Sequence, residues 1–239
     1  MNRKITAALL VAAAVLTNVA FTALGTVFDY PDVLKQPVDD ILTAFRASQT
    51  AVTTWFTVLA LSAALFAPIA VGVGRLSAAP AMRVAVPVGI AAAAVQVAGL
   101  MRWPLLVPGY AADAASPDPA VADAARDAFM TAHRILGNLV GETFGYILTA
   151  AWTLLVLVAL RGVLAGRWFT VLGAVSAVLV LSGVLSALDL PGVDLANFIG
   201  YVLWSVWLLA FAVLLLRPPR GARLRRDRRK DVLTRSATS

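Results

Sequence analysis

The stretch HRILGNLVGETFGYILTAAWTLLVLVAL (His133–Leu160) decides the fold, because it joins a long apolar run to a group of polar residues. A helix of about 20 apolar residues crosses the roughly 30 Å hydrocarbon core of a bilayer, and Ile135–Leu160 is long enough. The whole chain is 60% hydrophobic and 14% charged, whereas soluble domains have roughly 45–50% apolar and about 25% charged residues. The composition therefore predicts a protein that resides in lipid.

Five further apolar runs have the length of a membrane-spanning helix, and the sequence predicts a single all-α domain over residues 1–216. It is a polytopic helical bundle with six transmembrane helices, at residues 5–28, 51–73, 84–107, 135–160, 168–188 and 198–216. Residues 217–239 are rich in arginine and proline and predict a disordered basic tail. Its positive charge predicts contact with anionic lipid headgroups.

The positive charges fall on one side of these six spans. That side holds 15 of the 20 Lys and Arg residues: Arg3, Lys4, Arg75, Arg83, Arg161, Arg167 and nine in the tail from Arg217 to Arg235. The opposite side holds ten of the twelve aspartates. Because cytoplasmic loops carry the excess of Lys and Arg, we expect both termini to be cytoplasmic. The expected location is the cytoplasmic (inner) membrane of a bacterium.

Two of the outward loops have helical patterns of their own. Gln36–Ser48 has one apolar helical face after Pro37, formed by Val38, Ile41, Leu42 and Phe45. Ser116–Arg134 contains an Asp-Pro pair near its start that is typical of the beginning of a helix. Each loop predicts either a short helix that covers the bundle or a connector that continues a membrane helix.

The fourth span contains a ladder of small residues, Gly137, Gly141 and Gly145, which allows close approach of a neighbouring helix. At about 100° per residue, a polar stripe adjoins the ladder: Asn138, Glu142, Tyr146 and Thr149. The helix therefore has a small and polar face for the bundle interior and an apolar face for lipid.

A carboxylate within a membrane helix costs about 2.5–3.5 kcal/mol and requires a partner, a cavity or a proton. Arg102 in the third span is the best candidate cation. The polar residues of the outer half predict a ligand-binding pocket lined by Asn18, Gln96, Arg102, Asn138 and Glu142, with His133 near its roof. The alternative is that these groups satisfy one another and fix helix packing. The tryptophans Trp103, Trp152, Trp168, Trp204 and Trp207 are interpreted as interfacial anchors or lipid-facing residues.

The residue inventory argues against several classes of chemistry. The chain has no cysteine and one histidine, which argues against thiolate, iron–sulfur, bis-histidine haem and multi-histidine metal sites. We expect no metal, no cofactor and no catalytic residue. The basic tail lacks a folded domain and aromatic residues, so nucleic acid is not an expected partner.

Two segments carry a resemblance to a known family: AFRASQTAVTTWFTVLALSAALF (Ala44–Phe66) and GYILTAAWTLLVLVALRGVLAGRWFTVLGAVSAVLVLSG (Gly145–Gly183). In layout the chain resembles a bacterial six-helix membrane family catalogued as the domain of unknown function numbered forty-three eighty-six. The resemblance implies a six-helix inner-membrane protein and supplies no mechanism.

Three functions follow as hypotheses. The first is a non-enzymatic membrane protein, either an accessory subunit or a binder of a small or lipidic ligand. The alternative is a small transporter or channel subunit, proton-coupled through Glu142. An intramembrane enzyme is the third, and we lean against it because no nucleophile–base arrangement is present. A membrane-protein partner and a homo-oligomer both stay open.

Overall fold

The computed structural model describes residues 2–162, 164, 166–188 and 190–217, so the predicted basic tail from residue 218 onward lies outside the described residues. The fold is all-α, as predicted, and 87% helical. Six helical rods are long and apolar enough to cross a membrane. They are α1 (Arg3–Phe28), α3–α4 (Gln49–Ala64 and Phe66–Gly74), α5–α6 (Pro80–Leu105 and Val107–Asp113), α7–η2–α8 (Pro119–Ala132, His133–Phe144 and Gly145–Ala159), α9 (Arg167–Ser182) and α10 (Val193–Leu216).

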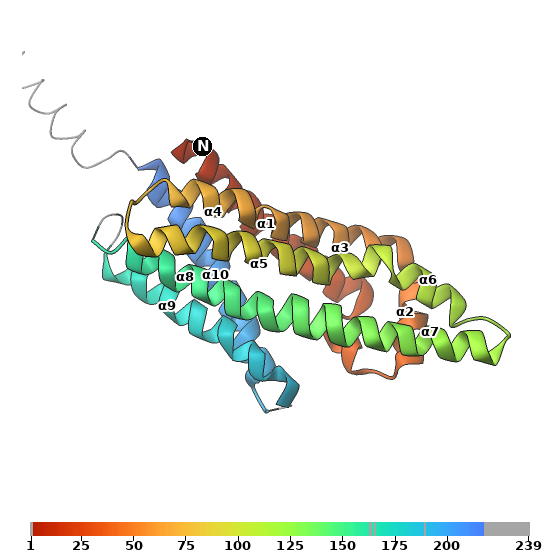
Figure 1. Cartoon of the computed structure of the whole chain (residues 1–239). Coiled ribbons are helices and arrows are strands. Elements are labelled where there is room, and N and C mark those ends of the chain that lie inside the picture. The colour runs from red at the N-terminus through yellow and green to blue at the C-terminus, as the bar shows by residue number, and fades with distance from the viewer. Residues whose placement is uncertain (1, 163, 165, 189, 218–239) are drawn as a thin grey trace, which may run out of the picture.

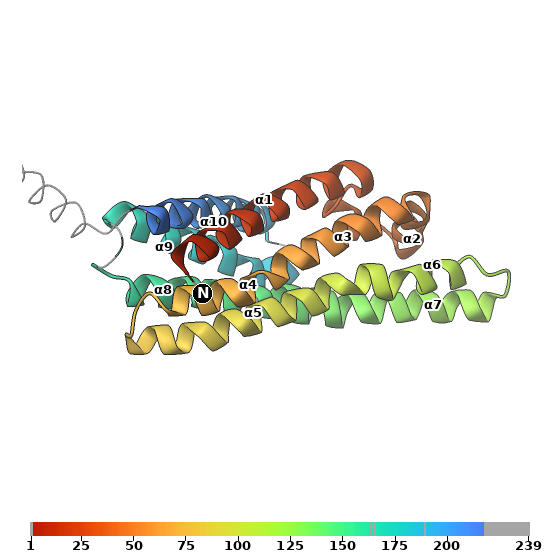
Figure 2. The ribbon, with the colours of Figure 1, turned by 90° about the horizontal axis from the view of Figure 1, so that it is seen from above.

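The rods form a closed ring in which each one packs against its neighbours in chain order, and α10 packs against α1 to complete the ring. The start of α1 and the end of α10 lie at the same end of the bundle (Figures 1 and 2). We call this the terminal end, and the opposite end, from which α6 and α7 project, the distal end. These six apolar rods indicate a multi-pass membrane protein.

The two loop segments with helical patterns differ in their structure. The first forms a separate helix α2 (Val38–Ala47), which follows the 3₁₀ helix η1 (Asp32–Lys35) and buries Ile41, Leu42 and Phe45. The second forms α7, capped by the Asp118 carboxylate on the backbone N–H of Ala120 at 2.9 Å, and continues directly into the fourth rod. That rod has 41 residues, or roughly 60 Å at 1.5 Å per residue, about twice the bilayer core.

Two separate hydrophobic cores lie along the bundle axis. The terminal core is built from α1, α4, α5, α8, α9 and α10, and the distal core from α1, η1, α2, α3, α5, α6 and α7. Among the described residues, the distal core contains no residue of α8, α9 or α10. Two polar residues of the spans lie between these cores along their helices: Asn18 falls between Ala14 and Ala20 on α1, and Gln96 between Ala93 and Trp103 on α5.

Aromatic side chains fill both cores, which corrects the interpretation of three tryptophans as interfacial or lipid-facing. Trp103, Trp152 and Trp207 are each 0% exposed. Trp103 stacks on Phe56 at 4.8 Å in the distal core, and Trp152 meets Trp207 edge to face at 5.9 Å in the terminal core. Aromatic pairs add about 0.5–1.5 kcal/mol beyond the area they bury, so the closed ring uses these side chains for packing.

Candidate functional site

The segment that joins α7 to α8 is wound as a π-helix, η2 (His133–Phe144). π-Helical windings usually occur as single turns and often mark functional sites, whereas this one covers 12 residues. Glycine is the weakest ordinary helix former, by about 1 kcal/mol relative to alanine, and Gly137 and Gly141 both lie within η2. The polar stripe predicted at 100° per residue assumed α-helical winding, so its side chains are placed differently around this segment.

Helix α5 crosses η2 where both helices have glycine, Gly99 on α5 and Gly141 of the predicted ladder on η2. A Cβ atom added to Gly99 would lie 2.6 Å from the Cα atom of Gly141 and 2.8 Å from the carbonyl oxygen of Leu136. The two backbones therefore touch directly, as small residues allow in membrane bundles. This contact sets the position of the next turn of α5, which carries Arg102.

Gly137 makes room for the side chain of Arg102. A Cβ atom at Gly137 would lie 2.8 Å from one terminal nitrogen (Nη2) of Arg102 and 2.9 Å from its Cζ atom. The other terminal nitrogen (Nη1) donates to the carbonyl oxygen of Gly99 at 2.6 Å. The guanidinium group is thus held between the backbones of α5 and η2, and the residue is only 5% exposed.

The charge on Arg102 is buried without an acidic partner. Among the described residues no carboxylate lies within 4.0 Å of it, and Nη2 is sealed from solvent without a hydrogen bond. The Trp103 ring lies 5.4 Å from the guanidinium carbon, a cation–π contact worth about 0.5–2 kcal/mol. A buried donor left without an acceptor costs about 1–3 kcal/mol, and more when it is charged.

Glu142, which lies in η2 together with Gly137, is the acid that acts electrostatically on this cation. It lies within electrostatic range of Arg102 but forms no ion pair with it. Its carboxylate has no hydrogen-bond partner among the described residues and is not sealed from solvent. Arg102 and Glu142 therefore act on each other without pairing: Nη2 of Arg102 is buried without an acceptor, whereas the Glu142 carboxylate keeps some contact with solvent.

Three of the four tyrosines surround Glu142. Tyr30, Tyr146 and Tyr201 all lie within electrostatic range of its carboxylate, and they come from three different parts of the ring. Tyr146 and Tyr201 are in ring contact at 6.0 Å. Burial raises the pKa of Tyr30 to about 12, so its hydroxyl stays protonated and able to donate near pH 7. We call Tyr30, Arg102, Glu142, Tyr146 and Tyr201 the polar cluster.

His133 lies at the edge of the polar cluster. Its imidazole stacks on Phe129 with an interplanar angle of 8°, and its Nδ1 atom is buried without a partner. It is within electrostatic range of Arg102, so the structure brings together three of the predicted site residues: Arg102, His133 and Glu142.

The other three predicted site residues lie elsewhere. Asn18 donates to the Ser205 hydroxyl at 2.9 Å and joins α1 to α10. Gln96 donates to the Thr149 hydroxyl at 3.2 Å and joins α5 to α8. Asn138 is exposed on η2. Asn18 and Gln96 therefore act as packing contacts between the two hydrophobic cores.

Tyr30 and Tyr201 were missed by the sequence reasoning. Tyr30 follows α1 in a polar loop, and Tyr201 lies in a run of apolar residues on α10. The available signal was compositional, since tyrosine is scarce in this chain and a buried hydroxyl usually finds a partner. Its use required knowing which residues of distant helices face the interior of the ring.

Comparison with known proteins identifies one family. No curated protein and no solved structure matches the chain, and no named homologue indicates a specific function. The family model described as "Domain of unknown function (DUF4386)" matches residues 5–212. This match covers all six membrane-length rods and confirms the resemblance seen in the sequence. The chain belongs to the DUF4386 family.

Proposed function

We propose that the polar cluster binds a small molecule through an anionic group on that molecule, and that the chain acts by binding rather than by catalysis. The observation that carries the proposal is the buried guanidinium of Arg102: in the part of the chain that the structure describes, its Nη2 atom has no acceptor and its charge has no acid within 4.0 Å. A carboxylate or phosphate would supply both. The tyrosine hydroxyls and Glu142 would supply further hydrogen bonds.

The position of the polar cluster supports binding over a permanently open pore. Between the cluster and the terminal end lies the terminal core, where Trp152, Trp207 and Phe211 are 0% exposed. A transporter would need to open this packed region in each cycle. With both termini in the cytoplasm of a bacterium, as the charge distribution predicts, the cluster would lie in the outer half of the inner membrane. The basic tail would then contact anionic lipids on the cytoplasmic side.

The test is a density map of the protein purified in nanodiscs, with mass spectrometry of the molecules that accompany it. We expect density from a non-protein group against Nη2 of Arg102, and a matching acid in the mass spectrum that is lost in Arg102→Gln. Arg126→Gln is the matched control, because Arg126 is partly exposed on α7 and pairs with Asp39. A map in which Arg102 closes on Glu142 with nothing between them would contradict the proposal.

A further inference from the structure

Arg102 and Glu142 are opposite charges that act on each other electrostatically and do not form an ion pair. A ligand with only an anionic group would satisfy Arg102 and leave Glu142 unsatisfied. A ligand that also carries an ammonium group would satisfy both, because its N–H groups donate to the carboxylate. We infer that the ligand of the polar cluster is a zwitterionic lipid, with an anionic phosphate at Arg102 and a primary ammonium at Glu142. This inference rests on the proposed function and names its ligand class.

The side of the ring formed by α9 and α10 is the route from the membrane to the cluster. In the distal half, the described residues of α8, α9 and α10 contribute nothing to the hydrophobic core. Helix α9 ends at Ser182, and the short 3₁₀ helix η3 (Gly183–Leu188) follows it. On this side the ring is therefore closed by a short helix and a turn, where the other sides have packed rods.

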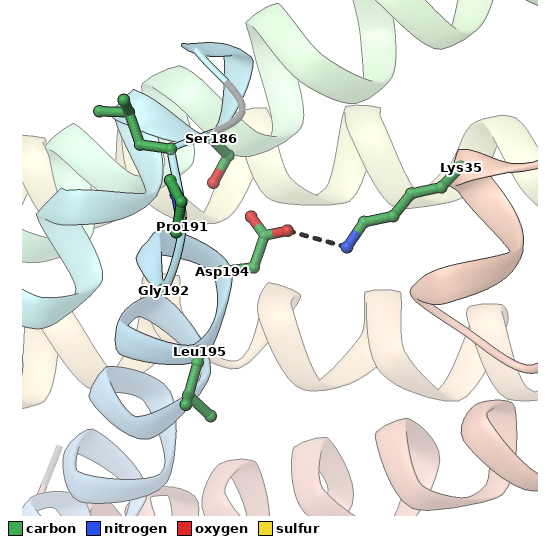
Figure 3. A pocket seen from close by; sticks show the side chains of 7 residues that line it. Lys35, Ser186, Pro191, Gly192, Asp194 and Leu195 are labelled. Atoms are coloured by element: carbon green, nitrogen blue, oxygen red, sulfur yellow. Dashed lines mark ion pairs between the residues drawn. The ribbon is translucent and has the colours of Figure 1, made fainter.

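A pocket of about 400 Å³ opens at this place, between η1 and the turn that leads into α10. Figure 3 shows Lys35 reaching across it from η1 to Asp194 in the first turn of α10, with Ser186 of η3 beside them. The Lys35 ammonium lies 3.0 Å from the Asp194 carboxylate, and their hydrogen bond raises the pKa of Lys35 above its usual value. Both side chains are well exposed, and exposed ion pairs contribute little to stability, so this contact can open at small cost.

The pocket opens beside exposed apolar side chains of α10, and one of its lining residues acts electrostatically on the polar cluster. Asp194 is within electrostatic range of Glu142 and Tyr146. Leu195, which lines the pocket, is 61% exposed, and Phe198, about one turn further along α10, is 49% exposed. A headgroup that enters beside Asp194 therefore leaves its acyl chains against α10, in the hydrocarbon of the membrane.

The charges at the pocket favour a zwitterion over a purely anionic lipid. Lys35 is shared between Asp32 at 3.4 Å and Asp194 at 3.0 Å, so the three groups together carry one net negative charge. Glu142 supplies a further carboxylate in the polar cluster, where the cation of Arg102 offsets its charge. This sequence of carboxylates repels a headgroup with only negative charge and attracts one that presents an ammonium group.

The experiment uses the full chain in nanodiscs made of equal parts phosphatidylethanolamine, phosphatidylglycerol and phosphatidylcholine. After extraction into mild detergent, native mass spectrometry counts the lipids that stay bound. We expect one phosphatidylethanolamine per chain, retained at least tenfold over the other two lipids. Glu142→Gln should lower this preference at least tenfold, and Arg102→Gln should abolish retention. Asp123→Asn, which removes an exposed acid paired with Arg126, should behave as the wild type.

A change on the ligand side makes the test independent of variant folding. N-acetylated phosphatidylethanolamine lacks the ammonium group and should fail to compete with the parent lipid for the wild-type protein. If phosphatidylglycerol is retained equally and Glu142→Gln changes nothing, the zwitterion inference is wrong while the anion site at Arg102 stands. If soluble phosphoethanolamine displaces the lipid at equal concentration, the ligand is a free zwitterion and the lipid route is wrong. If neither lipids nor soluble phosphate compounds bind, the zwitterionic-lipid inference is wrong, whereas the proposed function falls only if no acid of any kind accompanies the purified protein.

Discussion

The glycine crossing between α5 and η2 allows a quantitative prediction, because its geometry leaves no room for a side chain. In Gly99→Ala the new Cβ atom would lie 2.6 Å from the Cα atom of Gly141, whereas ordinary contact begins at 3.4 Å. The backbones must therefore separate by about 0.8 Å, the difference between these two distances. Backbone atoms cannot swing aside as a side chain can, so the cost is that of overpacking, about 1–3 kcal/mol.

For a chain of this size, each kcal/mol lowers the melting temperature by about 2–4 °C. We therefore expect Gly99→Ala to melt roughly 2–12 °C below the wild type in detergent, as measured by tryptophan fluorescence. Gly109→Ala is the matched control, since Gly109 lies further along the same rod in α6 with no heavy atom within 4 Å of an added Cβ. It should melt at or slightly above the wild-type temperature, because alanine favours the helix. Equal melting temperatures for both variants would refute the direct backbone contact.

Three further substitutions test the polar residues between the two cores. Gly137→Ala places a Cβ atom 2.8 Å from Nη2 of Arg102. Because the guanidinium end can move, we expect a smaller loss of stability than for Gly99→Ala. Ligand retention, measured by native mass spectrometry, should fall at least tenfold. Arg102→Met keeps the apolar stem and removes a buried unsatisfied donor that costs about 1–3 kcal/mol. The ligand-free variant should therefore have a higher melting temperature than the ligand-free wild type. A lower melting temperature would mean that the protein itself satisfies the guanidinium. Asn18→Val removes the hydrogen bond to Ser205, and interhelical hydrogen bonds of this kind contribute about 0.6 kcal/mol, up to about 1.7 kcal/mol. The free energy of unfolding, measured by chemical unfolding in mixed micelles, should fall by an amount in this range. An unchanged free energy of unfolding would contradict the packing role.

The six rods could be predicted from the sequence because the physics that forms them is local. A run of about 20 apolar residues satisfies its backbone internally and its side chains in lipid, whatever its neighbours are. The start of α7 was equally readable, since Asp118 and Pro119 supply the cap and the first turn by themselves. These features need no knowledge of the other helices.

The composition of the polar cluster could not be predicted for the opposite reason. Tyr30 and Tyr201 come within electrostatic range of Glu142 because α10 packs against α1 and closes the ring. Asn18 was grouped with Arg102 by depth, yet its partner Ser205 lies 187 residues away on α10. The depth of a residue along its span can be read from the sequence. Whether its side chain faces a given site depends also on its angle around the helix axis, which depth does not give. The π-helical winding of η2 changes that angle further, and no pattern in the sequence predicted it.

The two cores show why the charges of the cluster require a partner from outside the chain. The layer between them is already joined by neutral hydrogen bonds, from Asn18 to Ser205 and from Gln96 to Thr149. Packing at this depth therefore does not need Arg102 or Glu142, each of which costs about 2.5–3.5 kcal/mol within a membrane. If their role were to hold helices together, the two would pair, since the same cost would then be offset by their attraction. They act on each other electrostatically and do not form an ion pair, so the geometry fits a site in which a third group binds between them.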